Sequence, residues 1–270
     1  MNPAASAPEP DREAAETPIS ASSDALDRDA GIVTGIAAEG RVLLRALPAH
    51  WPTISHDNLE GRLACAGADT ARAKAGAERL LAEGATALVS FGIAGGLDPA
   101  LAPGALVLPE AVLTPGGEQV AVDAFWRQRV VASFAEGGGR VCAGLLLGSA
   151  AVIADRTTKA ARFGASGAIA VDMESHAVAE VARQAGVPLL VVRAIADPAE
   201  RALPAIVLGS IGANGEPRGG LVAGRLAIRP WQLPALLRLR QDARQALAAL
   251  GALARAAGPL LLGRLRGLSG

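Results

Sequence analysis

Short apolar runs alternate along the chain with longer segments of mixed polarity. The runs have the length of β-strands, and the longer segments have the length of helices. Strands are expected at residues 31–36, 62–67, 85–91, 105–113, 140–147, 167–171 and 187–195. Helices are expected at residues 69–83, 123–136, 157–164 and 173–185, with Asp69 or Thr70 capping the first and Asp123 the second. This alternation predicts a single three-layer α/β/α domain, in which helices cover both faces of a mostly parallel sheet.

The two ends of the chain depart from this pattern. Residues 1–29 are rich in Ala, Pro, Ser and acidic residues without periodicity, which predicts a disordered acidic tail. Residues 198–230 are rich in Pro and Gly and are expected to be irregular. Leucines at roughly helical spacing predict a long helix over residues 231–257. We therefore expect a folded domain at residues 30–260, which includes an Arg-rich helical region from about residue 231.

Composition argues against some partners. Aromatic residues make up 3% of the chain, whereas proteins that bind single-stranded nucleic acid stack bases on aromatic side chains. The formal net charge is zero, so no nucleic-acid partner is expected. The charge is uneven, however, because ten arginines against Glu216 and Asp242 occupy the chain from Arg201 to its end. Such an end is typical either of peripheral contact with an anionic membrane or of a solvated, Arg-rich face.

Targeting signals and metal motifs are absent from the sequence. The N-terminus lacks the basic-then-apolar pattern of a signal peptide, and no apolar run reaches the ~18 residues of a membrane span. Cys65 and Cys142 fall in strands expected to be buried, without metal-ligand spacing, as in a reduced compartment. His50, His56 and His176 are scattered, so no metal site is expected. We expect a cytoplasmic protein, and the Arg-rich end leaves peripheral contact at the inner membrane face open.

Carboxylates follow the ends of several predicted strands. Asp172 and Glu174 come directly after the apolar run at residues 169–171, and Asp197 follows the last predicted strand. Glu39 follows the first strand by a few residues. Parallel α/β sheets bind ligands beyond the carboxyl ends of their strands. These acids are therefore candidates for acid–base work on a small molecule.

Two other features lie near these strand ends. The glycine-rich run at residues 92–96 allows a tight turn or a close backbone approach to ribose or an anion, and both readings stay open. The run matches neither the G-x-G-x-x-G fingerprint nor a P-loop, which argues against a dinucleotide-dependent oxidoreductase. Arg193 interrupts an apolar strand, so it must pair with a carboxylate or face a ligand, because an unpaired buried charge is costly.

Taken together, four stretches of the chain resemble the nucleoside phosphorylase/nucleosidase superfamily. They are the segment from Gly31 to Glu39, Val-Ser-Phe-Gly-Ile-Ala-Gly-Gly-Leu ending at Leu97, Asp-Met-Glu-Ser ending at Ser175, and Val-Arg-Ala-Ile-Ala-Asp ending at Asp197. They are most similar to methylthioadenosine/S-adenosylhomocysteine nucleosidases, and the stretch that begins Arg229-Pro-Trp-Gln resembles the hopanoid-associated phosphorylase branch. The resemblance implies a mixed, mostly parallel central sheet, a homodimer and cleavage of the adenine N-glycosidic bond of adenosylhopane.

The resemblance also implies a role for each matching residue. Asp197 would be the general acid that protonates the purine, and Glu39 would orient or deprotonate the attacking water. Glu174 would hold the ribose hydroxyls, with Met173 beside the sugar, and Arg193 would help to position the acid end of the site. The chemistry agrees, because an oxocarbenium-like transition state needs a proton for the leaving base and negative charge near the sugar.

Three positions depart from the nucleosidase pattern and make the site more apolar. Ile93 stands where a small hydroxyl residue is usual, and Ala196 replaces a Ser beside the acid. Val152 replaces an aromatic residue next to Ile153, which lies where the family grips the base by backbone groups. These changes are compatible with a lipid-like 5′ substituent on the nucleoside substrate.

Several alternatives stay open. Within the class, the runner-up is a general methylthioadenosine/S-adenosylhomocysteine nucleosidase; outside it, a non-catalytic purine-nucleoside-binding protein. No cofactor is expected, but inorganic phosphate is allowed as a co-substrate, since Arg41, Arg45 or Arg193 could contribute to an anion site. The sequence therefore leaves hydrolysis and phosphorolysis undecided.

Overall fold

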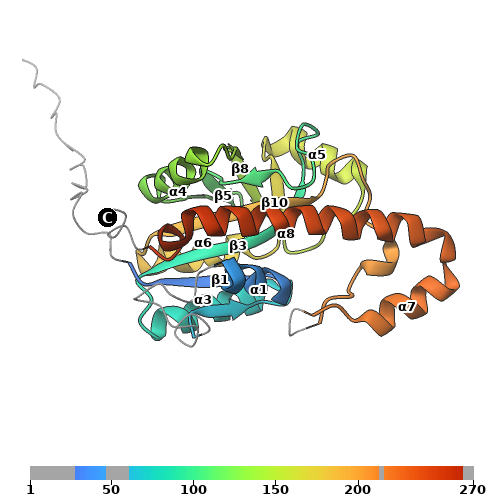
Figure 1. Cartoon of the computed structure of the whole chain (residues 1–270), viewed down its shortest axis with the longest axis horizontal. Helices are drawn as coiled ribbons and strands as arrows, with labels where there is room; N and C mark the ends of the chain where they lie inside the picture. Colours follow the sequence, from blue (N-terminus) through green and yellow to red (C-terminus); the bar gives the residue numbers. More distant parts are fainter. Residues whose placement is uncertain (1–27, 47–60, 213–215, 264–270) are drawn as a thin grey trace, which may run out of the picture.

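One mixed sheet with helices on both faces forms the protein (Figure 1), which confirms the predicted fold class. The computed structural model describes residues 28–46, 61–212 and 216–263. Ten strands of these residues belong to the sheet. Six of the strand pairings are parallel and three are antiparallel, so the sheet is mostly parallel as expected.

The centre of the sheet is the parallel pair β3 (Ala87–Gly96) and β10 (Leu189–Asp197). The other edge of β3 is shared: β1 (Ala30–Thr34) pairs with its first half, and β9 (Ala170–Asp172) pairs antiparallel with Gly95 and Gly96. On this edge, the strand next to β3 therefore changes from β1 to β9 at the glycine run. The remaining strands are β2 (Leu63–Cys65) beside β1; β8 (Leu145–Gly148), β5 (Ala111–Leu113) and β6 (Gln119–Ala121) beyond β9; and β4 (Leu106–Val107) and β7 (Val141–Cys142) beyond β10.

Helices cover both faces of this sheet. On one face, α1 (Ala37–Ala46) and α4 (Ala124–Glu136) pack against the long α8 (Leu233–Leu261), which lies along β10 and β3 (Figure 1). On the other face, α6 (Ser175–Ala185) packs against β3, β5 and β8 and against α3 (Thr70–Ala82). The buried Trp126 ties α4 to α8, because its indole Nε1 donates a 2.5 Å hydrogen bond to the Leu260 carbonyl.

Aspartate caps begin three of the helices. The side chains of Asp69, Asp123 and Asp155 accept hydrogen bonds from backbone N–H groups in the first turns of α3, α4 and α5 (Arg156–Ser166). Each cap satisfies an N–H group that has no partner within the helix. The predicted caps at Asp69 and Asp123 are thus confirmed, and the expected helix at residues 157–164 is α5.

Two long strands predicted from apolar runs are each divided in the structure. The run at 105–113 forms β4 and β5, separated by Pro109, which has no N–H to donate to a ladder. The run at 140–147 forms β7 and β8, separated by Gly144, whose φ of 142° suits glycine. Conversely, the glycine run predicted to follow a strand lies within β3, where β9 and β10 pair with it on either side. Cys65, predicted to be buried, is exposed at the end of β2.

The segment at 198–230 is not entirely irregular, so that prediction is wrong. It contains a 3₁₀ turn, η1 (Ala205–Val207), and the helix α7 (Gly219–Ile228). Helix α7 was missed because three of its residues are glycines, Gly219, Gly220 and Gly224, which have low helix propensity.

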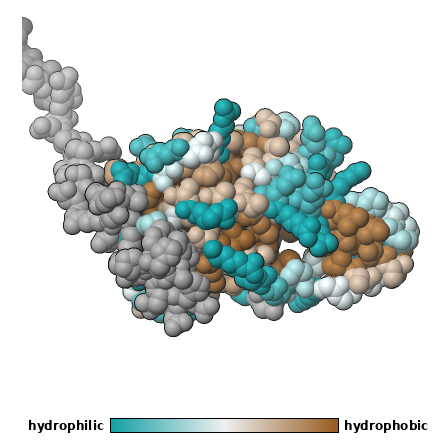
Figure 2. All heavy atoms as spheres, in the orientation of Figure 1, coloured by the Kyte–Doolittle hydropathy of each residue, from teal (hydrophilic) through white to brown (hydrophobic). Residues whose placement is uncertain are grey.

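A projecting arm consists of α7, the turn η2 (Pro230–Gln232) and the first turns of α8, at residues 216–240. Figure 1 shows it reaching beyond the sheet, and Figure 2 shows a hydrophobic patch on it. Six of the eight large apolar side chains exposed among the described residues lie at or near this arm: Leu208, Leu221, Ile228, Trp231, Leu233 and Leu237. The predicted helix in this region is confirmed as α8, with Pro234 in its first turn.

Most of the predicted acidic tail, residues 1–27, lies outside the described residues. Arg28 and Asp29, at its end, contact the domain. Arg28 pairs with Asp123 at 3.0 Å and lies 5.5 Å from the centre of the Trp126 ring, and Asp29 pairs with Arg62 at 2.7 Å. Within the described ranges, no helix is both long and apolar enough to span a membrane.

Candidate active site

The predicted acids gather around the glycine run of β3. Glu39 lies in the first turn of α1, just after β1; Glu174 lies at the start of α6, just after β9; and Asp197 is the last residue of β10. A Cβ added to Gly92 would lie 2.7 Å from the carboxylate of Glu39, and one added to Gly95 would lie 3.8 Å from Asp197 Oδ2. The glycine run therefore separates Glu39 from Asp197 and leaves room beside both.

Glu39 is buried and held by backbone groups. Its Oε2 accepts hydrogen bonds from the N–H groups of Gly35 at 2.7 Å and Ile36 at 2.9 Å, and its Oε1 accepts one from Ile93 at 2.9 Å. Burial raises the pKa of Glu39, while these hydrogen bonds and the nearby Arg193 oppose the rise. Glu39, predicted to follow the first strand as an acid–base candidate, is thus a fixed carboxyl group inside the site.

Glu174 lies next to Glu39 across the first βα connection. A Cβ added to Gly35 would lie 3.0 Å from Glu174 Oε1, and Glu174 is 7% exposed. Burial, followed by the negative charge of Asp172, raises the pKa of Glu174 to about 8, against the attraction of Arg193. Glu174 therefore holds a proton more readily than an exposed glutamate does.

Arg193 is paired inside the protein, one of the two alternatives that the sequence left open. Its guanidinium contacts Asp172 Oδ2 through Nε at 2.6 Å and Nη2 at 2.5 Å. Nη2 also donates to the hydroxyls of Ser90 at 2.6 Å and Ser175 at 2.9 Å, and Nη1 donates to a backbone carbonyl. All three guanidinium nitrogens are bonded, and 1% of the residue is exposed. Arg193 therefore acts on the acids of the site through its positive charge.

Asp197 is 9% exposed and is bonded to Lys159, a residue that sequence reasoning missed. Lys159 Nζ lies 2.5 Å from Asp197 Oδ2. Burial raises the pKa of Asp197 to about 6, although the Lys159 ammonium opposes this rise. Lys159 gave little signal in the sequence, because a lysine in the first turns of a short polar helix is typical of a solvated position.

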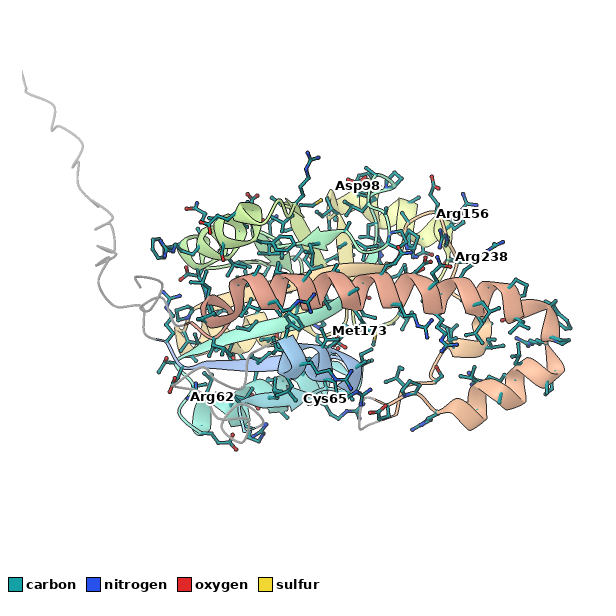
Figure 3. All side chains as sticks on the ribbon, in the orientation of Figure 1. Arg62, Cys65, Asp98, Arg156, Met173 and Arg238 are labelled. Atoms are coloured by element: carbon teal, nitrogen blue, oxygen red, sulfur yellow. The ribbon has the colours of Figure 1, made fainter. Side chains whose placement is uncertain are left out.

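The four remaining predicted residues lie at different depths. Ile93 and Met173 are half-buried. Met173, labelled in Figure 3, accepts a 2.9 Å hydrogen bond from the Thr70 hydroxyl through its backbone carbonyl. Ile153 is half-buried and packs against a small apolar cluster that includes Leu97 and Val171. Val152 is 50% exposed.

A cavity of about 570 Å³ lies beside this site and not over the acids. Its lining consists of Leu97, Pro99, Arg156, Thr157, Ala160, Phe163, Ala199 and Glu200. These residues come from the end of the glycine run, from the helix of Lys159 and from the turn after Asp197. The site itself is better defined by its buried carboxyl groups than by this cavity, because chemistry needs reactive groups and this lining contains none of the three acids.

In the described part of the chain, no three His, Cys, Asp or Glu side chains are arranged so that they could hold a metal ion. His176 is buried against Gly148, and burial lowers its pKa. His50 and His56 lie outside the described residues. With Asp197 and two further carboxyl groups around the glycine run, the arrangement is suited to acid–base chemistry.

Comparisons with known proteins agree with this fold. A sequence model of the phosphorylase superfamily matches residues 62–207. The 5′-methylthioadenosine/S-adenosylhomocysteine nucleosidase from Neisseria meningitidis, solved with methylthio-immucillin-A, superposes with a TM-score of 0.61 at 16% identity, covering 87% of this chain and 99% of that one. The futalosine hydrolase of Helicobacter pylori gives a TM-score of 0.58 at 15% identity, covering 84% and 97% of the two chains. A search of curated proteins finds no match.

The family match covers more than half of the chain and includes β3, β9 and β10 with Glu174 and Asp197. The solved structures, at identities of 15–16%, show that the fold is shared along nearly their whole length. The protein belongs to the phosphorylase superfamily.

Proposed function

We propose that the protein cleaves the adenine N-glycosidic bond of a 5′-substituted adenosine. One observation carries this proposal: three buried carboxyl groups, Glu39, Glu174 and Asp197, surround the glycine run at the ends of β1, β9 and β10. Family membership supports it, as do the names of the similar structures, which are nucleosidases and a futalosine hydrolase.

In the proposed reaction, the bond between the purine and C1′ of the ribose breaks as Asp197 donates a proton to the purine ring nitrogen. A pKa of about 6 keeps enough Asp197 protonated near neutral pH for this role. Glu174 binds the ribose hydroxyls and Met173 lies beside the sugar. Glu39, held rigidly by three backbone N–H groups, orients the attacking water or takes its proton. Backbone groups at Ile153 grip the base.

The substrate that we propose is adenosylhopane. The resemblance of the segment from Arg229 onward supports this choice, and so do the apolar residues Ile93 and Val152 in place of polar and aromatic ones. The second candidate is a general methylthioadenosine/S-adenosylhomocysteine nucleosidase, which the names of the similar structures favour. A binding protein without catalysis would not need three buried carboxyl groups, whose burial is costly.

Hydrolysis agrees better than phosphorolysis with the contacts of the three arginines that were candidates for an anion site. Arg193 is engaged by Asp172, and the exposed Arg41 pairs with Glu216. Arg45 is exposed in the last turn of α1. Inorganic phosphate stays open as a co-substrate, and the reaction products distinguish the two cases.

We further propose that the protein is cytoplasmic, forms a homodimer and touches the inner membrane face through its arm. The arm combines exposed apolar side chains, Ile228 and Trp231, with Arg229, Arg238 and Arg240. Arg238, labelled in Figure 3, lies in the first turns of α8, within the arm. A basic amphipathic surface with a tryptophan suits the interface of an anionic bilayer, from which a lipid-linked nucleoside would be drawn.

The test is adenine release by the purified protein from adenosylhopane in vesicles and from methylthioadenosine in solution, each with and without phosphate. We expect adenine and the 5-substituted ribose, with adenosylhopane cleaved faster. The 1-phosphate of that 5-substituted ribose, formed only with phosphate, would establish phosphorolysis. A clear preference for methylthioadenosine would favour the second candidate, and release from neither substrate would refute the proposed reaction.

A further inference from the structure

Lys159 is the one buried residue of α5, and its side chain is wholly inaccessible. The chain has only two lysines among its 26 basic residues, Lys74 and Lys159. Lys74 is exposed on α3, 4.0 Å from Glu78. A buried unpaired ammonium is strongly disfavoured, so the surroundings of Lys159 must compensate its charge.

Those surroundings match the three protons of an ammonium group. Lys159 Nζ donates to Asp197 Oδ2 at 2.5 Å, to the Pro198 carbonyl at 3.0 Å and to the Arg201 carbonyl at 2.9 Å, and the Asp197 carbonyl lies farther away, at 3.5 Å. The Pro198 and Arg201 carbonyls belong to the turn that follows β10. Lys159 therefore fixes both the Asp197 carboxyl group and the backbone on its C-terminal side.

The two oxygens of Asp197 have different surroundings as a result. Oδ2 accepts the Lys159 hydrogen bond, whereas no hydrogen bond from a described residue reaches Oδ1. A compact ammonium on a flexible stem can place one donor on each of three acceptors, which a planar guanidinium cannot do in the same space. The choice of lysine in a chain dominated by arginine fits this geometry.

We propose that Lys159 is a positioning residue, which holds the Asp197 carboxyl group through Oδ2 and so presents Oδ1 to the leaving base. This inference rests on the proposed role of Asp197 as the acid. The charge of Lys159 has a second effect: it opposes the rise that burial causes in the pKa of Asp197, and so keeps the acid able to lose its proton during turnover.

The test uses three variants of the full chain. Lys159→Gln removes the charge but keeps two N–H donors for the Pro198 and Arg201 carbonyls, so it preserves the turn. Lys159→Arg restores the charge with a different shape. Lys74→Gln removes the other lysine, which is exposed on α3, as a matched control. The readouts are the pH dependence of kcat/KM and the Asp197 carboxyl titration by ¹³C NMR, with its signal assigned through Asp197→Asn.

For Lys159→Gln we expect the pKa of Asp197 to rise by about one unit or more, because an opposing charge is lost. The fall of kcat/KM on the alkaline side should move to higher pH by the same amount, and kcat should fall about tenfold or more with little change in KM. Lys159→Arg should titrate close to the wild type but keep a lowered kcat, and Lys74→Gln should match the wild type in both readouts.

An unchanged Asp197 titration in folded Lys159→Gln would overturn the pairing, whatever the activity. A changed titration with kcat unchanged would overturn the positioning role. If instead the titration moves while Asp197→Asn remains fully active, the pairing stands and the proposed function fails. The NMR titration needs no turnover, so the two failures are distinguishable.

Discussion

The three acids of the site differ in what surrounds each carboxyl group. Glu39 accepts three backbone hydrogen bonds, Asp197 accepts one from an ammonium group, and Glu174 has the charge of Asp172 nearby. Burial raises the pKa of all three groups, and their neighbours add to that rise or oppose it. Three carboxylic acids in one site therefore differ in the surroundings that govern their ionisation.

Glu174 gives a prediction about stability. Its pKa rises from 4.5 to about 8 on folding, so folding favours the protonated form, and this contribution to stability is lost as the pH rises through 8. Glu174→Gln removes that loss. We expect its melting temperature to match the wild type near pH 4.5 and to exceed it by at least ~3 °C at pH 9. The same variant should release adenine more slowly, because it lacks the charge that faces the ribose cation.

Thermal melts by circular dichroism between pH 4.5 and pH 9 measure the effect, with Glu180→Gln, on the same helix, as the control. Equal melting temperatures for Glu174→Gln and wild type across that range would contradict the burial of an ionisable group at this position.

Gly92 gives a second prediction at this scale. An alanine Cβ at this position would lie 2.7 Å from the Glu39 carboxylate, so Gly92→Ala must displace that group and its hydrogen bond to the Ile93 N–H. We expect kcat to fall by about tenfold or more, as a general base out of position would lose its contribution. The control is Gly164→Ala, whose Cβ meets nothing within 4 Å on α5. Full activity in a folded Gly92→Ala would argue against a role for Glu39.

At the scale of secondary-structure elements, the sequence predicted the strands and helices that carry the site better than those that surround it. Asp172, Glu174 and Asp197 could be placed at strand ends because apolar runs lead directly into them. Lys159 could not be linked to Asp197, since that contact joins residues 38 positions apart in the chain through tertiary packing. Likewise, the helix that carries Glu39, α1, was not among the predicted elements; it is stabilised by packing on α8.

The arm carries its own prediction. Ile228 is 75% exposed and Trp231 is 71% exposed beside several arginines. We expect binding to anionic vesicles that is weakened by salt and reduced about tenfold or more in a Trp231→Ala, Ile228→Ala double variant, because each apolar side chain contributes on the order of 1 kcal/mol or more when buried in lipid. Phe125→Ala removes a 48% exposed aromatic from another helix and should bind like the wild type.

Co-sedimentation with vesicles of phosphatidylglycerol or of phosphatidylcholine measures this binding. Equal binding to the two vesicle types would remove the electrostatic part of the proposal. Unchanged binding in the double variant would remove the arm as the contact surface.

At the scale of the whole molecule, the first and last described residues are in contact. The Arg28 N–H donates to the Gly263 carbonyl at 3.0 Å, and the Arg28 side chain lies between Asp123 and Trp126. The sequence alone placed both Arg28 and Asp29 in the tail, because acidic and polar composition dominates the segment before them. Pairing with Asp123, at the start of α4, and with Arg62, just before β2, could be recognised only in three dimensions.

The contacts of Arg28 and Asp29 predict a difference in stability between two truncated proteins. Deleting residues 1–27 should leave the melting temperature within about 1 °C of the wild type, since a solvated acidic segment would bury little surface. Deleting residues 1–29 should lower it by roughly 2–4 °C or more, because the Arg28 and Asp29 contacts are lost. Differential scanning calorimetry compares the two. A large loss already on deleting residues 1–27 would show that the tail contributes to the folded domain.

The central claim is that Asp197 is the acid of an adenine N-glycosidase, and its most direct test is the rate of adenine release by Asp197→Asn. The amide keeps the shape of the side chain but cannot donate the proton to the leaving base. With the fold verified by an unchanged melting profile, we predict a rate reduced by about 10²–10⁴-fold relative to wild type at neutral pH. A folded Asp197→Asn protein that retains more than about a tenth of the wild-type rate would contradict the account.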